Sequence, residues 1–231
     1  MPDYKSRRTR DAEGARQAIL AAAEEHFARY GFSGARIDAI AEDSGYNKSL
    51  IFHYFTDKLE LYRAVVGCAK GDQETQLHVL LNRYIPDETT SLTRQQVHDF
   101  IVAMVHFWFD RMAANPKLRR ILMWEAAEEW QIYTKLPRNP QMVNRLAMVA
   151  QFLRRAQEQG FIRAEADPTI LMLNVSCMMM AYLASLSRHA MFFPDLDFTS
   201  PAALAHAREQ LTQLVLHGTM TPSFSEDSDA L

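Results

Sequence analysis

Cysteine is scarce in this chain of 231 residues, and the two cysteines, Cys68 and Cys177, lie far apart in the sequence. They form no C-x-x-C pair and no array with the spacing of a structural zinc site, which excludes a disulfide scaffold and a zinc module. The start M-P-D-Y-K-S-R-R-T-R is polar and basic and leads into no apolar core, so we expect no secretory signal peptide. We therefore expect a cytoplasmic protein with reduced thiols.

Glycine and proline are also infrequent, with eight and nine residues at spaced positions. No segment alternates apolar and polar residues with a period of two, as a half-buried strand would. This punctuation predicts an all-α protein of about nine helices joined by short connections. The helices are expected at about residues 12–30, 37–43, 47–55, 57–81, 95–114, 115–135, 141–159, 168–187 and 201–216.

One of these helices, residues 168–187, contains no charged residue and has the length of a transmembrane helix. It lacks the flanking basic cluster of a membrane span, and four polar residues interrupt it: Asn174, Ser176, Ser185 and Ser187. A membrane span and a buried or subunit-contacting helix are the two alternatives, and the composition favours the second. We expect no membrane partner.

Basic charge is concentrated at the extreme N-terminus, although the net charge of −3 does not by itself favour nucleic acid. The first ten residues hold one acidic residue, Asp3, and four basic ones: Lys5, Arg7, Arg8 and Arg10. Such a segment is either an arm that contacts DNA or a solvated tail.

Residues 37–54 have the pattern of a helix-turn-helix, which needs two short helices and a tight turn. Gly45 can adopt the left-handed turn, and Ile51 and Phe55 lie four residues apart on the inner face of the second helix. In the first helix, the residues spaced to face inward are Ile37, Ile40 and Ala41. The exposed half of the second helix carries side chains with donors for base edges: Asn47, Lys48, Ser49 and His53.

This segment resembles the TetR family of transcriptional regulators over residues 34–61, G-A-R-I-D-A-I-A-E-D-S-G-Y-N-K-S-L-I-F-H-Y-F-T-D-K-L-E-L. The shared features are the I-A pair, the turn glycine, the small polar residue and lysine that open the second helix, the final Y-F pair and the lysine three residues later. The resemblance covers about residues 12–66. It implies an arm and three-helix DNA-binding domain at 1–56 and a helical ligand-binding and dimerisation domain at 57–218. The final segment, 219–231, is rich in Ser, Asp and Pro, and this composition predicts a disordered tail.

The resemblance also implies roles for single residues. It places Tyr54 and Lys58 at positions that bind backbone phosphate, and it places at the major groove Asn47, Lys48, Ser49 and His53. Without the resemblance, Tyr54 would be taken as a core residue and Lys58 as a solvated lysine.

The chain departs from the family pattern at three positions. Leu50 replaces a frequent threonine and Phe52 a frequent tyrosine, so both lose a hydroxyl that often binds phosphate. We expect Leu50 to touch a thymine methyl group instead and Phe52 to pack. A threonine common before the first helix is Ala35 here, and the neighbouring Arg36 is expected to replace its phosphate contact.

The segment from Phe100 to Met180 is rich in methionine and aromatic residues, and the helix at 95–114 has two apolar faces. Such a helix separates two packed surfaces, and in a TetR-like domain one of them can line a ligand cavity. The candidate ligand-binding residues are Met104, Phe107, Trp108, Trp124 and Met178. The same composition would also fill a plain core. His106 and Glu125 are either polar groups of the cavity or exposed surface residues.

The resulting hypothesis is a ligand-responsive repressor without cofactor or metal. Its expected partners are a palindromic operator in double-stranded DNA, a small and largely apolar or aromatic effector, and a second copy of the chain that binds through the last two helices. Two alternatives remain. One is a helical interaction protein without DNA binding, and the other is a metal-dependent enzyme using His106 and Asp110, for which no third ligand has a recognisable spacing.

Overall fold

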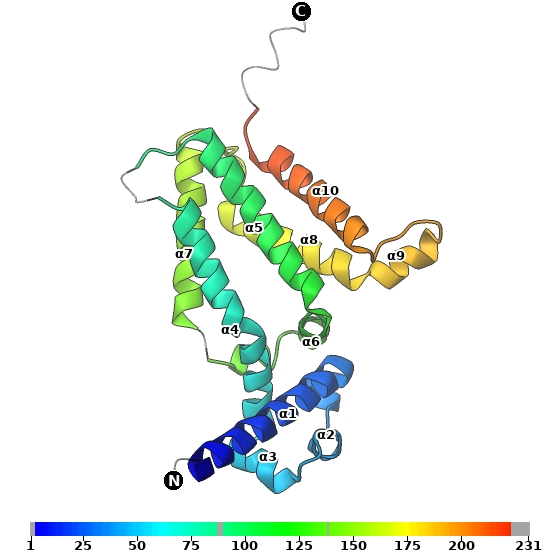
Figure 1. Ribbon diagram of the computed structural model, residues 1–231. Helices are drawn as coiled ribbons and strands as arrows, with labels where there is room; N and C mark the ends of the chain where they lie inside the picture. The colour runs from blue at the N-terminus through cyan, green and yellow to red at the C-terminus, as the bar shows by residue number, and fades with distance from the viewer. Residues whose placement is uncertain (1–2, 87–89, 138, 223–231) are drawn as a thin grey trace, which may run out of the picture. The chain divides into compact units, whose positions relative to one another are not determined.

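The computed structural model describes residues 3–86, 90–137 and 139–222, without the side chains of 3–11 and 68–74 (Figure 1). Its regular elements are helices: α1 Asp3–Gly34, α2 Ile37–Ser44, α3 Lys48–Tyr54, α4 Lys58–Tyr84, α5 Arg94–Ala114, α6 Pro116–Ala127, η1 Tyr133–Lys135, α7 Pro140–Glu158, α8 Pro168–Ala184, α9 Leu186–Phe192 and α10 Pro201–Thr219. The all-α prediction is confirmed.

Short polar side chains and prolines determine where many of these helices begin. The side chain of the residue before the helix accepts a backbone N–H of the first turn at seven helices, and these caps are Asn47, Asp57, Thr93, Asn115, Asn139, Asp167 and Ser200. Proline opens α6, α7, α8 and α10, where its missing N–H costs nothing. These signals explain why the predicted starts of the capped helices agree closely with the observed ones.

The chain divides into two compact units. Unit 1 contains Met1–Gln73 and Asn115–Pro137, so it joins α1, α2, α3 and the first part of α4 to α6 and η1. Its core is built around Ile19, Phe27, Ile40, Ile51 and Leu61, all of them fully buried. Ile121 of α6 belongs to this same core. The division therefore differs from the predicted boundary at residue 57, because α6 packs along α1.

Unit 2 contains Glu74–Ala114 and Arg138–Leu231, and α5 is its central helix. α8 and α10 both pack against α5, and the buried residues of α5 are Val97, Phe100, Ile101, Val105, Phe109 and Met112. Phe100 meets Phe152 of α7 with ring centroids 4.4 Å apart. This helix packs on more than one side, as its two apolar faces predicted.

Three predicted helix boundaries need correction. The first helix begins at Asp3 rather than near residue 12. The helix that begins at Pro116 ends at Ala127 rather than near residue 135, because Glu129 and Trp130 adopt positive φ angles of 56° and 60°. The helix predicted at 168–187 breaks at Ser185, and α8 and α9 meet there at 61°.

The C-terminal segment is ordered for longer than predicted. Thr219 is completely buried, and Met220 forms an isolated β-bridge with Ile162. The disordered tail therefore does not begin at residue 219. Residues 223–231, the remainder of that predicted tail, lie outside the described residues.

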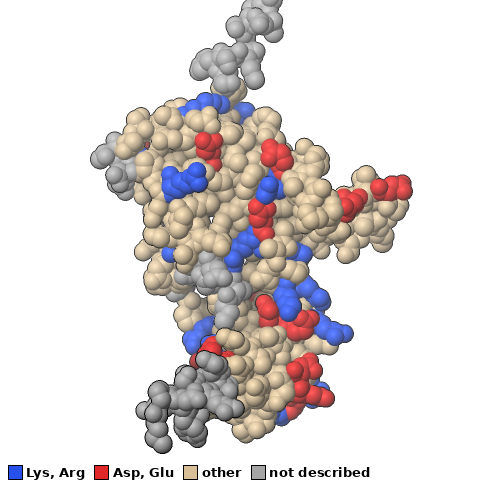
Figure 2. All heavy atoms as spheres, in the orientation of Figure 1, with Lys and Arg blue, Asp and Glu red and all other residues tan. Residues whose placement is uncertain are grey.

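In the part of the chain that the structure describes, no single helix has both the length and the apolar character to cross a membrane. The bent pair of α8 and α9 passes the test of length and composition when the two are taken together. Figure 2 shows acidic and basic side chains interspersed on the visible face, with few charges over large areas. The side chains of the basic segment Lys5, Arg7, Arg8 and Arg10 lie outside the described ones.

Candidate nucleic-acid interface

The turn between α2 and α3 has the geometry that the sequence predicted. Gly45 takes a left-handed conformation with φ 75° and ψ 13°, and its N–H points back to the carbonyls that end α2. Asn47 then caps α3, because its side-chain oxygen accepts the backbone N–H of Leu50 at 2.9 Å. The two helices are thus joined by a short connection whose backbone groups are bonded.

The inner faces of α2 and α3 fix both helices on α1. Ile40 and Ile51 have no exposed surface, and Phe55 at the end of α3 is 2% exposed. These side chains pack in the cluster that holds Phe27 and Leu61. Burying such apolar side chains stabilises a structure by roughly 1.5–3 kcal/mol each. The orientation of α3 is therefore set by the unit's main core.

The outer face of α3 is open. Its exposed residues are Asn47, Lys48, Ser49, Phe52 and His53, while Leu50 and Tyr54 are half-buried. Lys48 forms an ion pair with Asp38 of α2, and both side chains are more than half exposed. The four major-groove candidates, Asn47, Lys48, Ser49 and His53, therefore share one exposed surface.

Two of the three departures from the family pattern, Phe52 and Leu50, differ in exposure. Phe52 does not pack in the core, since its side chain is 46% exposed. Ile51 and Phe55 fill the inner face of α3, and Phe52 follows Ile51 by about 100° around the helix, toward the outer face. Leu50, the predicted thymine contact, is half-buried.

The phosphate candidates Tyr54, Lys58 and Arg36 differ in how they are held. The Tyr54 hydroxyl donates to the carbonyl of Ala12 in α1 at 3.0 Å, so it has a partner within the protein. Arg36 is exposed and precedes α2 in an extended conformation. The Arg36 side chain is therefore open to solvent at the start of the first helix of the motif.

Lys58 at the start of α4 is partly enclosed. Its ammonium lies 4.7 Å from the ring centroid of Phe32, and its Nζ donates to the carbonyl of Ser33 at 3.5 Å. Burial lowers the pKa of Lys58, and the Glu128 carboxylate opposes this effect by attracting the charged form. The end of α1 therefore positions this lysine.

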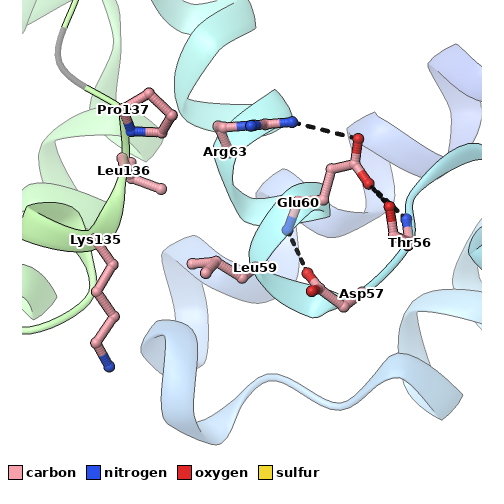
Figure 3. A pocket seen from close by; sticks show the side chains of 8 residues that line it. All are labelled: Thr56, Asp57, Leu59, Glu60, Arg63, Lys135, Leu136 and Pro137. Atoms are coloured by element: carbon pink, nitrogen blue, oxygen red, sulfur yellow. Dashed lines mark hydrogen bonds and ion pairs between the residues drawn. The ribbon is translucent and has the colours of Figure 1, made fainter.

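A hollow of about 390 Å³ lies at the beginning of α4 in unit 1 (Figure 3). One wall is formed by Leu136 and Pro137, and Glu60 lies opposite, where it accepts the Thr56 N–H at 2.6 Å and the Arg63 guanidinium at 3.3 Å. Bonding to Thr56 lowers the pKa of Glu60. Thr56, Asp57, Glu60 and Arg63 bond to one another in this hollow, and we assign it no ligand.

Sequence reasoning missed a polar connection between α4 and α6. Glu125 is 2% exposed, and it accepts the Tyr62 hydroxyl at 2.5 Å and the Tyr133 N–H at 2.9 Å. The alternative that Glu125 is an exposed surface residue is therefore wrong. Its position among apolar residues of α6 was the only signal in the sequence, and it did not reveal the partners.

Trp124 of α6 packs against α1. A Cβ added to Gly31 would lie 3.1 Å from the Trp124 ring, and Gly31 has φ 68° and ψ −179°. Such a backbone conformation is almost restricted to glycine. Trp124 is thus in unit 1, whereas the other predicted ligand-binding residues are in unit 2.

Those other residues, Met104, Phe107, Trp108 and Met178, are neither deeply buried nor fully exposed. The first three are half-buried on α5, where the rings of Phe107 and Trp108 meet edge to face at 5.2 Å, and Met178 on α8 is 40% exposed. None of these four residues lines the second hollow, of about 420 Å³, whose largely polar walls are formed by residues between 154 and 168.

The proposed metal pair has other interactions. Asp110 accepts a hydrogen bond from Arg208 of α10 at 2.6 Å, and His106 lies 3.8 Å from Glu209. Burial, and then Arg208, lower the pKa of His106. Within the described residues, no group of three or more His, Cys, Asp or Glu side chains could hold a metal ion. His106 and Asp110 are therefore structural contacts between α5 and α10.

The chain has a helix-turn-helix with an exposed second helix, followed by a separate helical unit. This arrangement is typical of transcriptional regulators that combine a DNA-binding domain and a regulatory domain in one polypeptide. The N-terminal model of the bacterial regulatory proteins of the tetR family matches residues 19–65, and the tetracyclin repressor-like C-terminal domain matches residues 98–215. The chain belongs to the TetR family and is a DNA-binding transcriptional regulator.

Relatives and solved structures agree with this assignment. The HTH-type transcriptional repressor SCO4008 of Streptomyces coelicolor is 32% identical over 172 residues, which cover 72% of this chain and 78% of that protein. The regulator RutR of Escherichia coli is 40% identical over 60 residues, 26% of this chain and 28% of its own. The solved structure of SCO4942 from Streptomyces coelicolor has a TM-score of 0.60 and 26% identity, and it covers 90% of this chain and 99% of that one.

Proposed function

We propose that the chain represses transcription by binding a pseudo-palindromic operator as a homodimer, and that a small, largely apolar or aromatic effector releases it. The exposed face of α3 is the observation that supports the proposed DNA binding. The donors on this face are Lys48, Ser49 and His53, and the buried Ile51 anchors the helix in the core. The relative SCO4008 is named a repressor, which supports repression over activation. Such a protein acts in the cytoplasm, where chromosomal DNA lies.

The proposed dimer uses α8 and α10, because α8 carries an uncovered apolar stripe and α10 follows it with an exposed leucine among polar residues. On α8 one exposed stripe of small or aliphatic side chains recurs at helical spacing, with the exposed Thr169, Asn174 and Ser176 beside it: Ile170, Leu173, Cys177, Ala181 and Ala184. On α10 Leu214 is 58% exposed. Two such helices from each copy form a four-helix bundle, and a two-fold interface is the commonest symmetry of homo-oligomers.

A two-fold dimer requires a two-fold DNA site. Its half-site centres should be separated by about one helical turn, or a multiple of it, so that both copies of α3 enter the major groove on one side of the duplex. We propose that Lys48, Ser49 and His53, together with the amide group of Asn47, contact base edges. Arg36 and Lys58 would then bind phosphates on either side.

The proposed effector site lies on the α5 side of unit 2, near Met104, Phe107, Trp108 and Met178. Methionine and aromatic side chains provide an adaptable apolar lining, and their partial exposure leaves surface that a ligand can cover. The ligand shifts the DNA-competent population by its differential affinity for the two states, typically about 1–3 kcal/mol.

Selection of genomic fragments by the purified protein tests the DNA-binding proposal. We expect the recovered fragments to share a two-fold motif and to bind more weakly as the salt concentration rises, because the contacts with phosphate release counterions. Recovery of unrelated fragments, bound no better than random DNA, would contradict operator recognition.

A screen for compounds that release the operator tests the effector proposal. Trp108→Ala should weaken the response to an active compound, whereas Trp130→Phe, in unit 1, should leave it unchanged. A response that is equal in both variants would contradict the placement of the site.

A further inference from the structure

Phe52 is the large apolar side chain of α3 that is exposed to solvent. In this helix, all of whose residues are described, Ile51 is completely buried and Leu50 and Tyr54 are half-buried, whereas Phe52 is 46% exposed. A single exposed apolar residue needs no explanation on an ordinary surface. On this surface it lies among residues proposed to meet DNA, so its chemistry can be tested against a specific ligand.

The position of Phe52 on α3 is near the centre of the exposed face. Successive helix residues are rotated by about 100°, so Lys48 and Phe52 lie one turn apart and Ser49 and His53 lie beside them. All four residues are exposed, whereas Ile51 is completely buried. If α3 enters the major groove with Lys48, Ser49 and His53 facing the bases, the ring of Phe52 therefore reaches the base edges as well.

The chemistry of the ring restricts what it can recognise there. A phenyl group has no donor or acceptor, so it cannot replace the phosphate contact of a tyrosine hydroxyl. The apolar group that bases present in the major groove is the C5 methyl of thymine. We infer that Phe52 is a specificity-determining residue that reads the C5 methyl of a thymine in each half-site. This inference rests on the proposed operator binding.

The partial burial of Leu50 supports this assignment. Leu50 was the other apolar candidate for a thymine contact, but its neighbours cover part of it, and its N–H is bonded to the Asn47 cap. Phe52 has more open surface for a base to cover. Because Phe52 is outside the core, its removal should also leave the unit folded.

Replacement of thymine by deoxyuridine tests the inference, because it removes only the methyl group. The probe is the operator duplex recovered by selection, with each thymine of one half-site replaced singly. Wild-type protein should lose about fourfold in affinity at one thymine, since a buried methyl group contributes about that factor. Replacement in both half-sites should cost about fifteenfold.

The Phe52→Ala variant should bind the native operator more weakly and lose the deoxyuridine penalty at that thymine. Phe52→Leu should keep part of the penalty, because it keeps apolar surface. The matched control is Ser49→Ala on the same face, which should keep the whole penalty. Thermal unfolding should be alike for all four proteins.

Two results would overturn the inference. One is a wild-type protein that binds the operator with no deoxyuridine penalty at any thymine, and the other is a penalty of equal size in wild type and Phe52→Ala. Either result would leave operator binding itself intact. Failure of the wild type to distinguish the operator from random DNA would instead overturn the proposed function together with this inference.

Discussion

The hydroxyl of Tyr62 on α4 donates a hydrogen bond of 2.5 Å to the buried carboxylate of Glu125 on α6. Tyr62 is 1% exposed and Glu125 is 2% exposed, so water does not replace either partner. The second donor to Glu125 is the N–H of Tyr133 at 2.9 Å. α6 follows the predicted DNA-binding domain by about sixty residues in sequence, yet these contacts make it part of the same unit.

Tyr62→Phe should lower the free energy of unfolding by about 1–3 kcal/mol, because it leaves a buried carboxylate with one donor fewer. Chemical denaturation measures this change. Tyr30→Phe is the control, since Tyr30 is 43% exposed and its substitution should change stability by less than about 0.5 kcal/mol. Equal effects of the two substitutions would contradict the importance of the Glu125 hydrogen bond.

The same residue should give a pH dependence at the alkaline end. Burial, and then the Glu125 carboxylate, raise the pKa of Tyr62 above its ordinary value of about 10. The folded chain therefore keeps a proton that the unfolded chain loses, and stability falls as pH rises above about 10. Wild type should lose up to about 1.4 kcal/mol per pH unit relative to Tyr62→Phe. A constant difference between the two proteins from pH 8 to pH 11 would contradict this.

Gly31→Ala should destabilise unit 1 by about 2 kcal/mol or more. The φ of 68° with extended ψ is strained for alanine, and the new Cβ would press on the Trp124 ring at 3.1 Å. Gly14→Ala in the same helix is the matched control, because its Cβ would meet nothing within 4 Å. That substitution should stabilise by about 0.5–1 kcal/mol. Thermal unfolding of both variants checks the contrast, and a change of the same sign in both would refute it.

Lys58→Ala and Lys48→Ala should affect DNA binding in different ways. Removing a phosphate-binding charge at Lys58 should weaken all sequences alike and reduce the salt dependence, by about 0.9 in log–log slope for each phosphate that the protein no longer neutralises. Removing Lys48 should relax the preference at one or two base positions, with about 1–3 kcal/mol for a good base contact. Titrations of operator and random DNA at several salt concentrations separate the two roles. Unchanged specific affinity in both variants would show that the assigned roles are wrong.

Leu173→Glu should dissociate the proposed dimer, because it places a charge in an apolar interface. Leu173 is 55% exposed, so the substitution should not unfold the single chain. Val143→Glu is the control, because Val143 is 53% exposed and belongs to α7, outside the two helices of the proposed interface. Sedimentation should show a dimer dissociation constant raised at least about tenfold in the first variant only. A monomeric wild type at micromolar concentration would contradict the interface.

Local signals allowed most helix starts and the whole α2–turn–α3 motif to be predicted. Caps such as Asn47 and Asp167 and the left-handed Gly45 act through neighbouring backbone groups, so the sequence near each residue is sufficient. The break at Ser185 and the positive φ angles at Glu129 and Trp130 carry no such signal. These two helix ends were therefore established only by the structure.

Contacts between distant segments account for the remaining differences. Glu125 bonds to Tyr62, sixty-three positions away, and Met220 pairs with Ile162, fifty-eight positions away. No local sequence pattern specifies either contact. Phe52 is a different case, because the spacing of Ile51 and Phe55 predicted the inner face of α3 correctly, whereas the exposure of Phe52 was not predicted. The residue types were visible in the sequence, but their neighbours were not.

Hydroxyl-radical footprinting of the selected operator tests most directly the central claim that two copies of α3 read a two-fold DNA site. The account predicts two protected segments related by two-fold symmetry, with centres about one helical turn apart or a multiple of it, and the loss of both in Leu173→Glu at protein concentrations that protect the wild-type complex. A single asymmetric protected segment, or protection that is the same in wild type and Leu173→Glu, would contradict it.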